Sequence, residues 1–294
     1  CGGAGGGDGL VAEPLSFSRK ITRSHPMAQA IALIGYGAIG RAVHRLLLTH
    51  GAGQAEVVAV LARDRARVLA QSPEVATLLV GSHAEMAARR PVLVVECAGH
   101  QAVDDHGVAT FKAGIDLLLV SVGALADAAR EQSLVAAAGA AGKCLILPSG
   151  AIGGIDWLAA ARTAGLASVT YRSRKPPQAW AGSAAEKQLD LASLTTATTF
   201  FRGSAREAAL MYPRNANVAA TVALATLGFD RTQVELMADP GAEGNVHEIE
   251  AEGEGGSMAT RLVGRPDPDN PRTSVMTAHS VVRCILNQTA TVVM

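Results

Sequence analysis

Short apolar runs alternate with amphipathic stretches through the first half of the chain. Runs of this length that are apolar at nearly every position are typical of strands buried on both faces of a parallel sheet. They lie at Ala30–Gly35, Glu56–Ala62, Val92–Gly99, Asp116–Gly123 and Lys143–Gly150. Stretches between them, such as RAVHRLLLTHG and AREQSLVAAAGAAG, have the character of helices. Strands that alternate with helices predict a parallel α/β sheet with right-handed crossovers over residues 27–150.

The pattern changes after about residue 150. β-forming residues gather at Ser168–Ser173 and Leu194–Phe201, and longer strands are expected at Gln233–Ala238 and Val246–Glu252. In the last of these, one set of side chains is mostly glutamate and the alternate set is His247, Ile249 and Ala251, which indicates an open sheet with one solvated face. With a helix expected at Val218–Leu227, the pattern predicts an α+β domain over residues 151–272.

The two ends of the chain differ from the rest. Residues 1–26 begin CGGAGGGDGL and have no helical or strand period, so a flexible extension is expected there. The segment Thr273–Leu286 places its apolar residues on one helical face. We therefore expect a helix within residues 273–290 that packs back on the first domain.

Composition narrows the function classes. The 294 residues are 49% hydrophobic and 18% charged, which is typical of a globular protein. Lysine plus arginine and aspartate plus glutamate both total 26, and aromatic residues make up 3%, so nucleic-acid partners are not expected. No apolar run approaches the roughly 20 residues of a membrane span. The four cysteines show no CxxC pair and no zinc spacing, which predicts reduced thiols, no metal site and a cytoplasmic location.

The sequence GYGAIG follows the first apolar run and opens an amphipathic helix. Its glycines, Gly35, Gly37 and Gly40, have the GxGxxG spacing that provides a tight turn, close approach of a pyrophosphate and close helix packing. Ala38 and Ile39 begin the helix, whose free N–H groups and positive dipole end attract phosphate. The strand-turn-helix context favours dinucleotide binding over a purely structural turn.

The tip of the second strand leaves the choice of cofactor open. Asp64 is positioned to bind a ribose 2′-hydroxyl, which would favour NAD. Arg63 and Arg65 flank it and are suited either to a 2′-phosphate or to solvent. The sequence therefore predicts NAD or NADP without choosing between them.

Polar residues of the second half supply candidates for chemistry. The cations of YRSRKPP, including Arg172, Arg174 and Lys175, are candidates to receive a dicarboxylate. Asn215 or Asn217 precedes an apolar helix and is a candidate helix cap. His247, at the entry of a strand, is a candidate for proton transfer near neutral pH, with an ordinary pKa near 6.5. Spacing alone does not separate these roles from structural ones.

Several segments together resemble the L-aspartate dehydrogenase family. They run in order from about residue 31 to the C-terminus, and the most specific are YPRNANVAAT and NVHEIEA, supported by IGYGAIG, VECAGH and LPSGAIGGID. The resemblance implies a Rossmann domain joined to an α+β domain like that of homoserine dehydrogenase, usually in a homodimer. It also implies oxidation of L-aspartate to iminoaspartate with NAD or NADP, in NAD biosynthesis.

The resemblance also assigns residues. The family's cofactor contacts fall on Ala151 and Asn217, and its catalytic histidine falls on His247. Tyr36 and Ser149 depart from the family pattern without removing a functional group. Two alternatives remain open: a related dehydrogenase or reductase acting on another small substrate such as homoserine or an aldehyde, and a dinucleotide-binding sensor without catalysis.

Overall fold

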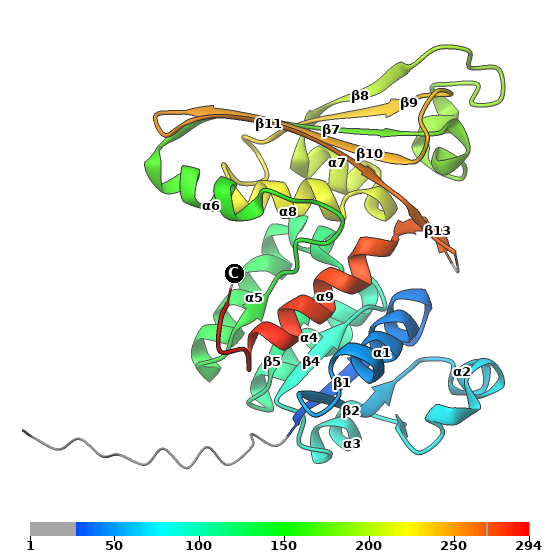
Figure 1. The fold of residues 1–294 in the computed structure, drawn as a ribbon, viewed down its shortest axis with the longest axis vertical. Helices are drawn as coiled ribbons and strands as arrows, with labels where there is room; N and C mark the ends of the chain where they lie inside the picture. The colour runs from blue at the N-terminus through cyan, green and yellow to red at the C-terminus, as the bar shows by residue number, and fades with distance from the viewer. Residues whose placement is uncertain (1–27, 269, 294) are drawn as a thin grey trace, which may run out of the picture.

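Two β-sheets, each with its own helices, make up residues 28–268 and 270–293, the part of the chain that the computed structural model describes (Figure 1). The extension expected at residues 1–26 lies outside the described residues. None of the described helices is both long enough and apolar enough to cross a membrane.

The first sheet has six parallel strands in the order β3-β2-β1-β4-β5-β6. The strands are β1 (Gln29–Ile34), β2 (Ala55–Leu61), β3 (Leu79–Val80), β4 (Leu93–Glu96), β5 (Asp116–Leu119) and β6 (Leu145–Ile146). The order reverses direction beside β1, and ligands of such sheets bind outside the strand ends at that point. The predicted α/β fold class is confirmed. The two-residue strand β3 was not expected, because it is too short to show a period.

Helices cover both faces of this sheet. Side chains of β1 alternate, so that Ile31 and Leu33 pack with helix α1 (Ala38–His50) while Ala32 and Ile34 face the opposite side. The opposite side is covered by α3 (His83–Ala88), α4 (His100–Lys112) and α5 (Ala128–Ala141), and α2 (Arg65–Gln71) follows the end of β2. Burial on both faces explains why the strands are apolar at nearly every position.

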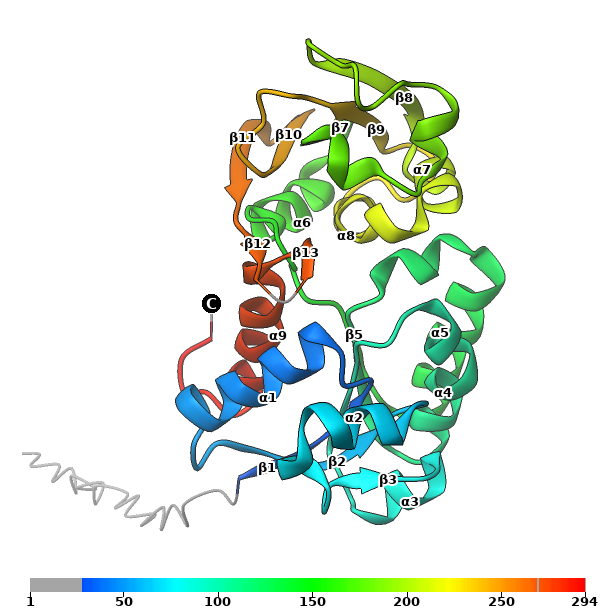
Figure 2. The same cartoon turned by 90° about the vertical axis from the view of Figure 1, so that its right-hand side faces the viewer.

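The C-terminal helix α9 (Val275–Asn287) lies beside α1, as Figures 1 and 2 both show. Its apolar face, which includes Val281 and Ile285, joins the same buried cluster as Val43 and Leu47 of α1. The helix begins two residues later than the expected Thr273, because residues 273–274 end strand β13 (Asn270–Ser274) and the Ser274 hydroxyl accepts a hydrogen bond from the Met276 amide.

The second sheet is mixed, in the order β11-β10-β7-β9-β8. Its strands are β7 (Leu166–Lys175), β8 (Thr198–Ser204), β9 (Gln233–Ala238), β10 (Asn245–Gly253) and β11 (Gly256–Gly264). On β10 the side chains of His247, Ile249 and Ala251 are buried while Glu250 is exposed, so the expected alternation is confirmed. Figures 1 and 2 show α6 (Ile155–Ala164), α7 (Ala205–Met211) and α8 (Asn217–Ala225) between this sheet and the six-stranded one.

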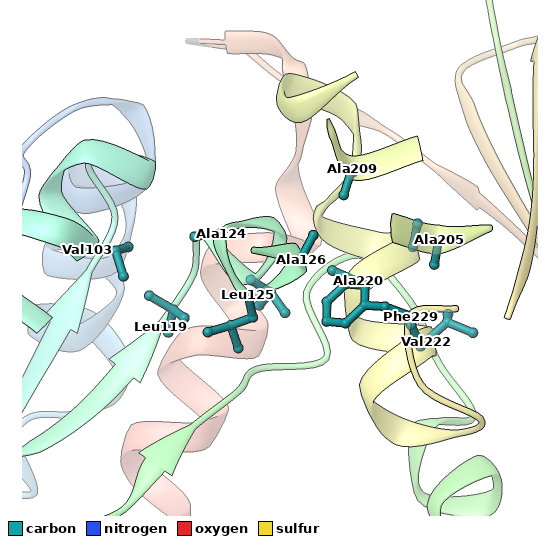
Figure 3. Close-up of a cluster of buried hydrophobic side chains, with 14 of the residues drawn as sticks. Val103, Leu119, Ala124, Leu125, Ala126, Ala205, Ala209, Ala220, Val222 and Phe229 are labelled. Carbon is teal, nitrogen blue, oxygen red and sulfur yellow. The ribbon is translucent and has the colours of Figure 1, made fainter. Parts of the chain in front are cut away.

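An apolar cluster joins the two halves. The short 3₁₀ helix η2 (Val122–Ala126), which follows β5, packs against α7 and α8. Figure 3 shows Leu125 and Ala126 beside Ala220 and Phe229, so the exits of the six-stranded sheet contact the helices under the other sheet directly. This contact fixes the position of α8 relative to the strand ends.

Candidate active site

A pocket with a cavity volume of about 120 Å³ opens where the two halves meet. Residues from both halves line it: Ile39, Val120, Val122, Pro148, Ser149, Gly150, Ala151, Lys175, Asn215, Asn217, Val218, Thr221, Asn245, His247, Thr273, Ser274 and Thr277. It lies at the carboxyl ends of the parallel strands, beside the glycine loop, where the sheet order predicts a ligand. The pocket brings together five of the residues singled out from the sequence: Ile39, Ala151, Lys175, Asn217 and His247.

The glycine loop has the geometry that its spacing predicts. Gly35 has φ of +93°, and a Cβ there would lie 2.7 Å from Ala98 Cβ. A Cβ at Gly40 would lie 2.5 Å from the Gly35 carbonyl oxygen, so close packing of α1 requires glycine. At Gly37 a Cβ would meet no atom within 4 Å. The space over Gly37 and the uncapped start of α1 at Ala38 leave room and N–H donors for a phosphate group.

Tyr36, one of the two departures from the family pattern, is accommodated within the same loop. Its hydroxyl lies 2.7 Å from Nδ1 of His44, eight residues further along the chain in α1, and Tyr36 is buried while His44 is partly buried. Burial raises the pKa of Tyr36 to about 12. The Tyr36 side chain therefore packs against α1, the helix that follows it, rather than over Gly37.

Glu96 holds the exits of β4 and β5 together. It is 1% exposed, and its carboxylate accepts hydrogen bonds from the amides of Ala98 and Gly99 at 2.7 Å. It also accepts from the amide and the hydroxyl of Ser121, each at 3.1 Å. Burial raises the pKa of Glu96, and the four hydrogen bonds oppose that shift. The ECAGH segment is thus a rigid edge next to the glycine loop.

Asn217 and Asn215 are not helix caps, so the capping interpretation was wrong. The N-cap of α8 is Ala216, which provides no side-chain acceptor. The Asn217 side-chain oxygen accepts a 2.9 Å hydrogen bond from the Gly123 amide instead. The Asn215 oxygen accepts from Lys175 Nζ, also at 2.9 Å. Both asparagines line the pocket, and these two hydrogen bonds hold their side chains in place.

Lys175 and Arg174 lie on opposite faces of β7. Alternation along the strand turns Lys175 into the pocket, where it is 6% exposed, its ammonium lies 5.0 Å from the Trp180 ring centroid, and it forms no ion pair within the described chain. Burial lowers the pKa of Lys175 to about 8. Arg174 forms ion pairs with Asp239 at 3.2 Å and Glu248 at 3.8 Å on the other face. Arg172 forms an ion pair with Glu235 at 2.7 Å. Of the three cations that are candidates to bind substrate, only Lys175 lines the pocket.

His247 is 3% exposed and lines the pocket from β10. Its Nδ1 lies 2.8 Å from the hydroxyl of Tyr171, and the rings are stacked at an interplanar angle of 20°. Burial and the nearby Lys175 cation lower the pKa of His247 to about 3. The value near 6.5 considered from the sequence is that of an unperturbed imidazole, and the sequence does not show how deeply this one is buried.

At the tip of β2, the carboxylate of Asp64 accepts a 2.9 Å hydrogen bond from the Arg67 amide and caps α2. Arg63 is exposed and forms no ion pair within the described residues. The backbone of Leu61, where β2 ends, accepts from the Gly35 amide at 2.8 Å, so this tip lies beside the glycine loop. The Asp64 carboxylate is therefore engaged within its own helix, whereas Arg63 has no ion-pair partner in the described part of the chain.

Sequence reasoning missed Tyr171, Ser274 and Thr277 at this site. A signal for Tyr171 was present, because residues two apart on a strand share a face and YRSRK places Tyr171 with Lys175. Ser274 and Thr277 come from the start of α9, and no local pattern connects them to β10. Among the described residues, no group of three or more His, Cys, Asp or Glu side chains is placed to hold a metal ion.

Comparison with known proteins gives a consistent result over most of the chain. The family model "Homoserine dehydrogenase, NAD binding domain" matches residues 35–148, and "Aspartate dehydrogenase, C-terminal" matches residues 156–288. The chain is 48% identical over 264 residues to the L-aspartate dehydrogenase of Cupriavidus necator, with 88% of this chain and 97% of that protein covered. It is 49% identical over 266 residues to that of a Polaromonas species, with the same coverage.

Solved structures share the fold. The aspartate dehydrogenase of Thermotoga maritima superposes with a TM-score of 0.71 at 24% identity, covering 90% of this chain and 99% of that one. A homoserine dehydrogenase of Thiobacillus denitrificans gives 0.59 at 13% identity, covering 89% and 74%. The second likeness matches the expectation of a homoserine dehydrogenase-like architecture.

Proposed function

The chain belongs to the L-aspartate dehydrogenase family, and from this premise we propose that it oxidises L-aspartate to iminoaspartate, which hydrolyses to oxaloacetate and ammonia. One observation carries the proposal: a buried neutral imidazole, His247, and a buried cation, Lys175, face the same pocket next to a dinucleotide-binding loop. A base and an anion site are what oxidation of a dicarboxylic amino acid requires.

The residues fit a nicotinamide cofactor. NAD or NADP, when bound, supplies the acceptor for the hydride that leaves the α-carbon of the substrate. We assign the pyrophosphate to the open space at Gly37 and to the N–H groups of Ala38 and Ile39. Gly35 and Gly40 shape the loop, while Ala151 and Asn217 border the pocket in which the reacting carbon would lie.

We assign Lys175 to a substrate carboxylate. Its charge is buried and has no carboxylate partner in the described chain, so an incoming carboxylate would compensate the cost of that burial. Arg174 is neutralised by Asp239 and Glu248 on the other face of the sheet and is a weaker candidate. Asn215 holds the lysine ammonium in place at 2.9 Å.

We assign proton transfer to His247. The α-ammonium of aspartate must lose a proton before its carbon can release hydride, and a neutral imidazole accepts that proton. The nitrogen that remains for the pocket is Nε2, since Nδ1 contacts Tyr171. The same imidazole can later help water to attack the imine.

The family membership extends the proposal to the whole molecule. We propose that residues 27–150 bind the cofactor, that residues 151–272 bind the substrate and form a homodimer, and that residues 273–290 return to the first part. The proposed role in NAD biosynthesis places the enzyme in the cytoplasm. Three cysteines of the described chain, Cys97, Cys144 and Cys284, are free thiols, in keeping with a reducing compartment.

A substrate panel tests the proposal. The purified chain is incubated with L-aspartate, D-aspartate, L-homoserine or a small aldehyde, each with oxidised or reduced NAD or NADP as the reaction requires, and reduced nicotinamide is followed by absorbance. We expect turnover with L-aspartate and none with D-aspartate, whose α-hydrogen would point away from the acceptor. Turnover with homoserine or the aldehyde alone would favour the related dehydrogenase or reductase. Tight cofactor binding without any turnover would favour a sensor.

A further inference from the structure

We propose that Tyr171 is a positioning residue for His247, accepting a hydrogen bond from its Nδ1–H so that the Nε2 lone pair faces the pocket. This role rests on the proposed function, in which His247 accepts a proton from the substrate. Tyr171 lies behind the imidazole and does not line the pocket, so it acts through His247 alone.

The register of the sheet creates this pair. His247 of β10 lies directly opposite Ser173 of β7, and Tyr171 lies opposite Ile249. Tyr171 and His247 are therefore diagonal neighbours on one face, at a separation that aromatic side chains span. The Tyr171 hydroxyl reaches Nδ1 at 2.8 Å, and both side chains are almost completely buried.

The hydrogen bond between Tyr171 and His247 can form with two different arrangements of the protons. A neutral imidazole has one N–H and one lone pair. If the Tyr171 hydroxyl donates to Nδ1, the proton of the ring is on Nε2, and His247 faces the pocket as a donor with no lone pair to accept a proton. If Nδ1–H donates to the Tyr171 oxygen, Nε2 carries the lone pair. Only the second arrangement makes His247 a base.

Ser173 makes the second arrangement possible. In that arrangement the hydroxyl proton of Tyr171 needs another acceptor. The Ser173 Oγ lies close enough to affect the pKa of Tyr171, and it is buried without a hydrogen-bond partner of good geometry in the described chain. A buried hydroxyl without a partner is costly. A proton directed from Tyr171 to Ser173 satisfies both groups and leaves Nδ1–H as the donor from His247.

The same arrangement also stabilises the protonated form of His247. When Nε2 takes the substrate proton, the imidazolium has two N–H donors, and the Tyr171 oxygen already accepts one of them. Burial raises the pKa of Tyr171 well above its usual value, so the phenol stays neutral and the proton remains on the imidazole. Tyr171 therefore orients and stabilises the ring without exchanging a proton with the substrate.

The variant Tyr171→Phe tests this role, with Tyr212→Phe as the matched control. Tyr212 is equally buried in the same half of the molecule, and its hydroxyl accepts from Gln188, away from the pocket. We expect Tyr171→Phe to lower kcat for L-aspartate roughly 10- to 100-fold, as loss of an orienting partner typically does. The KM for L-aspartate and the Kd for cofactor should stay near wild type. Tyr212→Phe should leave kcat unchanged.

A second readout does not depend on activity. The ¹⁵N shifts of labelled histidine report which ring nitrogen carries the proton, and the His247 signals are assigned by their absence from His247→Asn. We expect the proton on Nδ1 in the wild type and a shift toward Nε2 in Tyr171→Phe. Ser173→Ala should move the equilibrium in the same direction, because it removes the acceptor for the tyrosine proton.

The outcomes separate the two proposals. A wild-type proton on Nε2, or a Tyr171→Phe variant with normal kcat and an unchanged pH profile, would overturn the positioning role. A lower melting temperature with normal turnover would make Tyr171 a structural residue only, which also overturns it. If the wild type does not oxidise L-aspartate, the proposed function fails, while the ¹⁵N spectra still decide the Tyr171–His247 relationship.

Discussion

The side-chain oxygen of Asn217 accepts a 2.9 Å hydrogen bond from the amide of Gly123. This bond joins the first residue of α8 to the turn that follows β5, so it ties the helices under one sheet to the strand ends of the other. Because the oxygen is engaged, the side-chain amide nitrogen of Asn217 is the group left to donate to a ligand in the pocket.

Two variants at Asn217 separate these contacts. Asn217→Asp keeps an acceptor for Gly123 but removes the donor, whereas Asn217→Ala removes both. We expect both variants to weaken cofactor binding by about tenfold, in keeping with about 1–1.5 kcal/mol for one hydrogen bond. Only Asn217→Ala should also lower the melting temperature. Calorimetric titration and thermal unfolding measure the two effects, and unchanged cofactor affinity in Asn217→Asp would remove Asn217 from the cofactor site.

Gly37→Val tests the phosphate loop. A Cβ at Gly37 meets no protein atom within 4 Å, so the variant should fold and melt near the wild-type temperature. The branched side chain would occupy the space that we assign to the pyrophosphate, and Kd for NAD and NADP should rise at least about tenfold. Gly139→Val, at an exposed and equally open position in α5, is the control. Equal affinity in the two variants would contradict the assignment.

Much of the fold was predictable because its strands obey simple periods. Strands buried on both faces gave apolar runs, and β10, buried on one face, gave the alternation of glutamates with His247, Ile249 and Ala251. The edge strand β11 was not predicted. Its partly exposed sequence GSMATRLVG has no apolar side to bury deeply, and tertiary pairing with β10 determines its structure.

The site was predictable where the chemistry is local. The glycine loop is one segment, and its geometry follows from backbone sterics. The roles of Arg174 and Lys175 were separable in principle by strand alternation, but the sequence does not show which face of β7 meets the pocket. The low pKa of His247 comes from burial and from Lys175 on another strand, and no pattern along the chain contains that information.

Arg63→Ala tests the choice of cofactor. Arg63 is exposed at the tip of β2, and the carboxylate of Asp64, which follows it, accepts the hydrogen bond that caps α2. We expect the variant to weaken NADP binding by roughly 10- to 100-fold, which is the range for a hydrogen bond to a charged group, and to leave NAD binding nearly unchanged. Arg45→Ala makes the same charge change at an exposed site on α1. If both cofactors lose affinity equally, or neither does, Arg63 is a solvated side chain.

The pH dependence of anion binding tests Lys175. Its pKa is lowered to about 8, so it is a cation below that pH and a neutral amine above it. Binding of succinate, which has the two carboxylates of aspartate but no amino group to titrate, should be at its full strength near pH 7 and weaken as the pH rises through 8. The sign follows because the carboxylate stabilises the charged form.

Two variants check that the titrating group is Lys175. Lys175→Met should bind succinate weakly at every pH. Lys175→Arg keeps a charge that does not titrate in this range, so whatever affinity it retains should not depend on pH. Wild-type affinity that stays constant from pH 7 to pH 9.5 would show that Lys175 does not anchor the dicarboxylate.

His247→Ala tests the centre of the proposed chemistry. Loss of a general acid–base residue should lower the turnover of L-aspartate by roughly 10²–10⁴-fold. Cofactor affinity should stay near wild type, because the phosphates are assigned to the glycine loop and not to His247. His279→Ala, at an exposed position on α9, should leave turnover unchanged and serves as the control. Turnover is measured per folded site, with the melting temperature recorded alongside.

The pH behaviour of the same residue gives an independent check. Since the pKa of His247 is lowered to about 3 when the protein is folded, while an unfolded histidine titrates near 6.5, the unfolded chain binds more protons between these values. Stability should therefore fall as the pH drops from 6.5 toward 3, and His247→Asn should lose less free energy of unfolding over that range than the wild type. For the same reason, the pH profile of kcat/KM for the wild type should have no inflection near pH 6.5 that can be attributed to His247. Near-wild-type turnover in the folded His247→Ala variant would refute the catalytic role. If wild type and His247→Asn lost equal stability on acidification, the imidazole would not be buried as a neutral group.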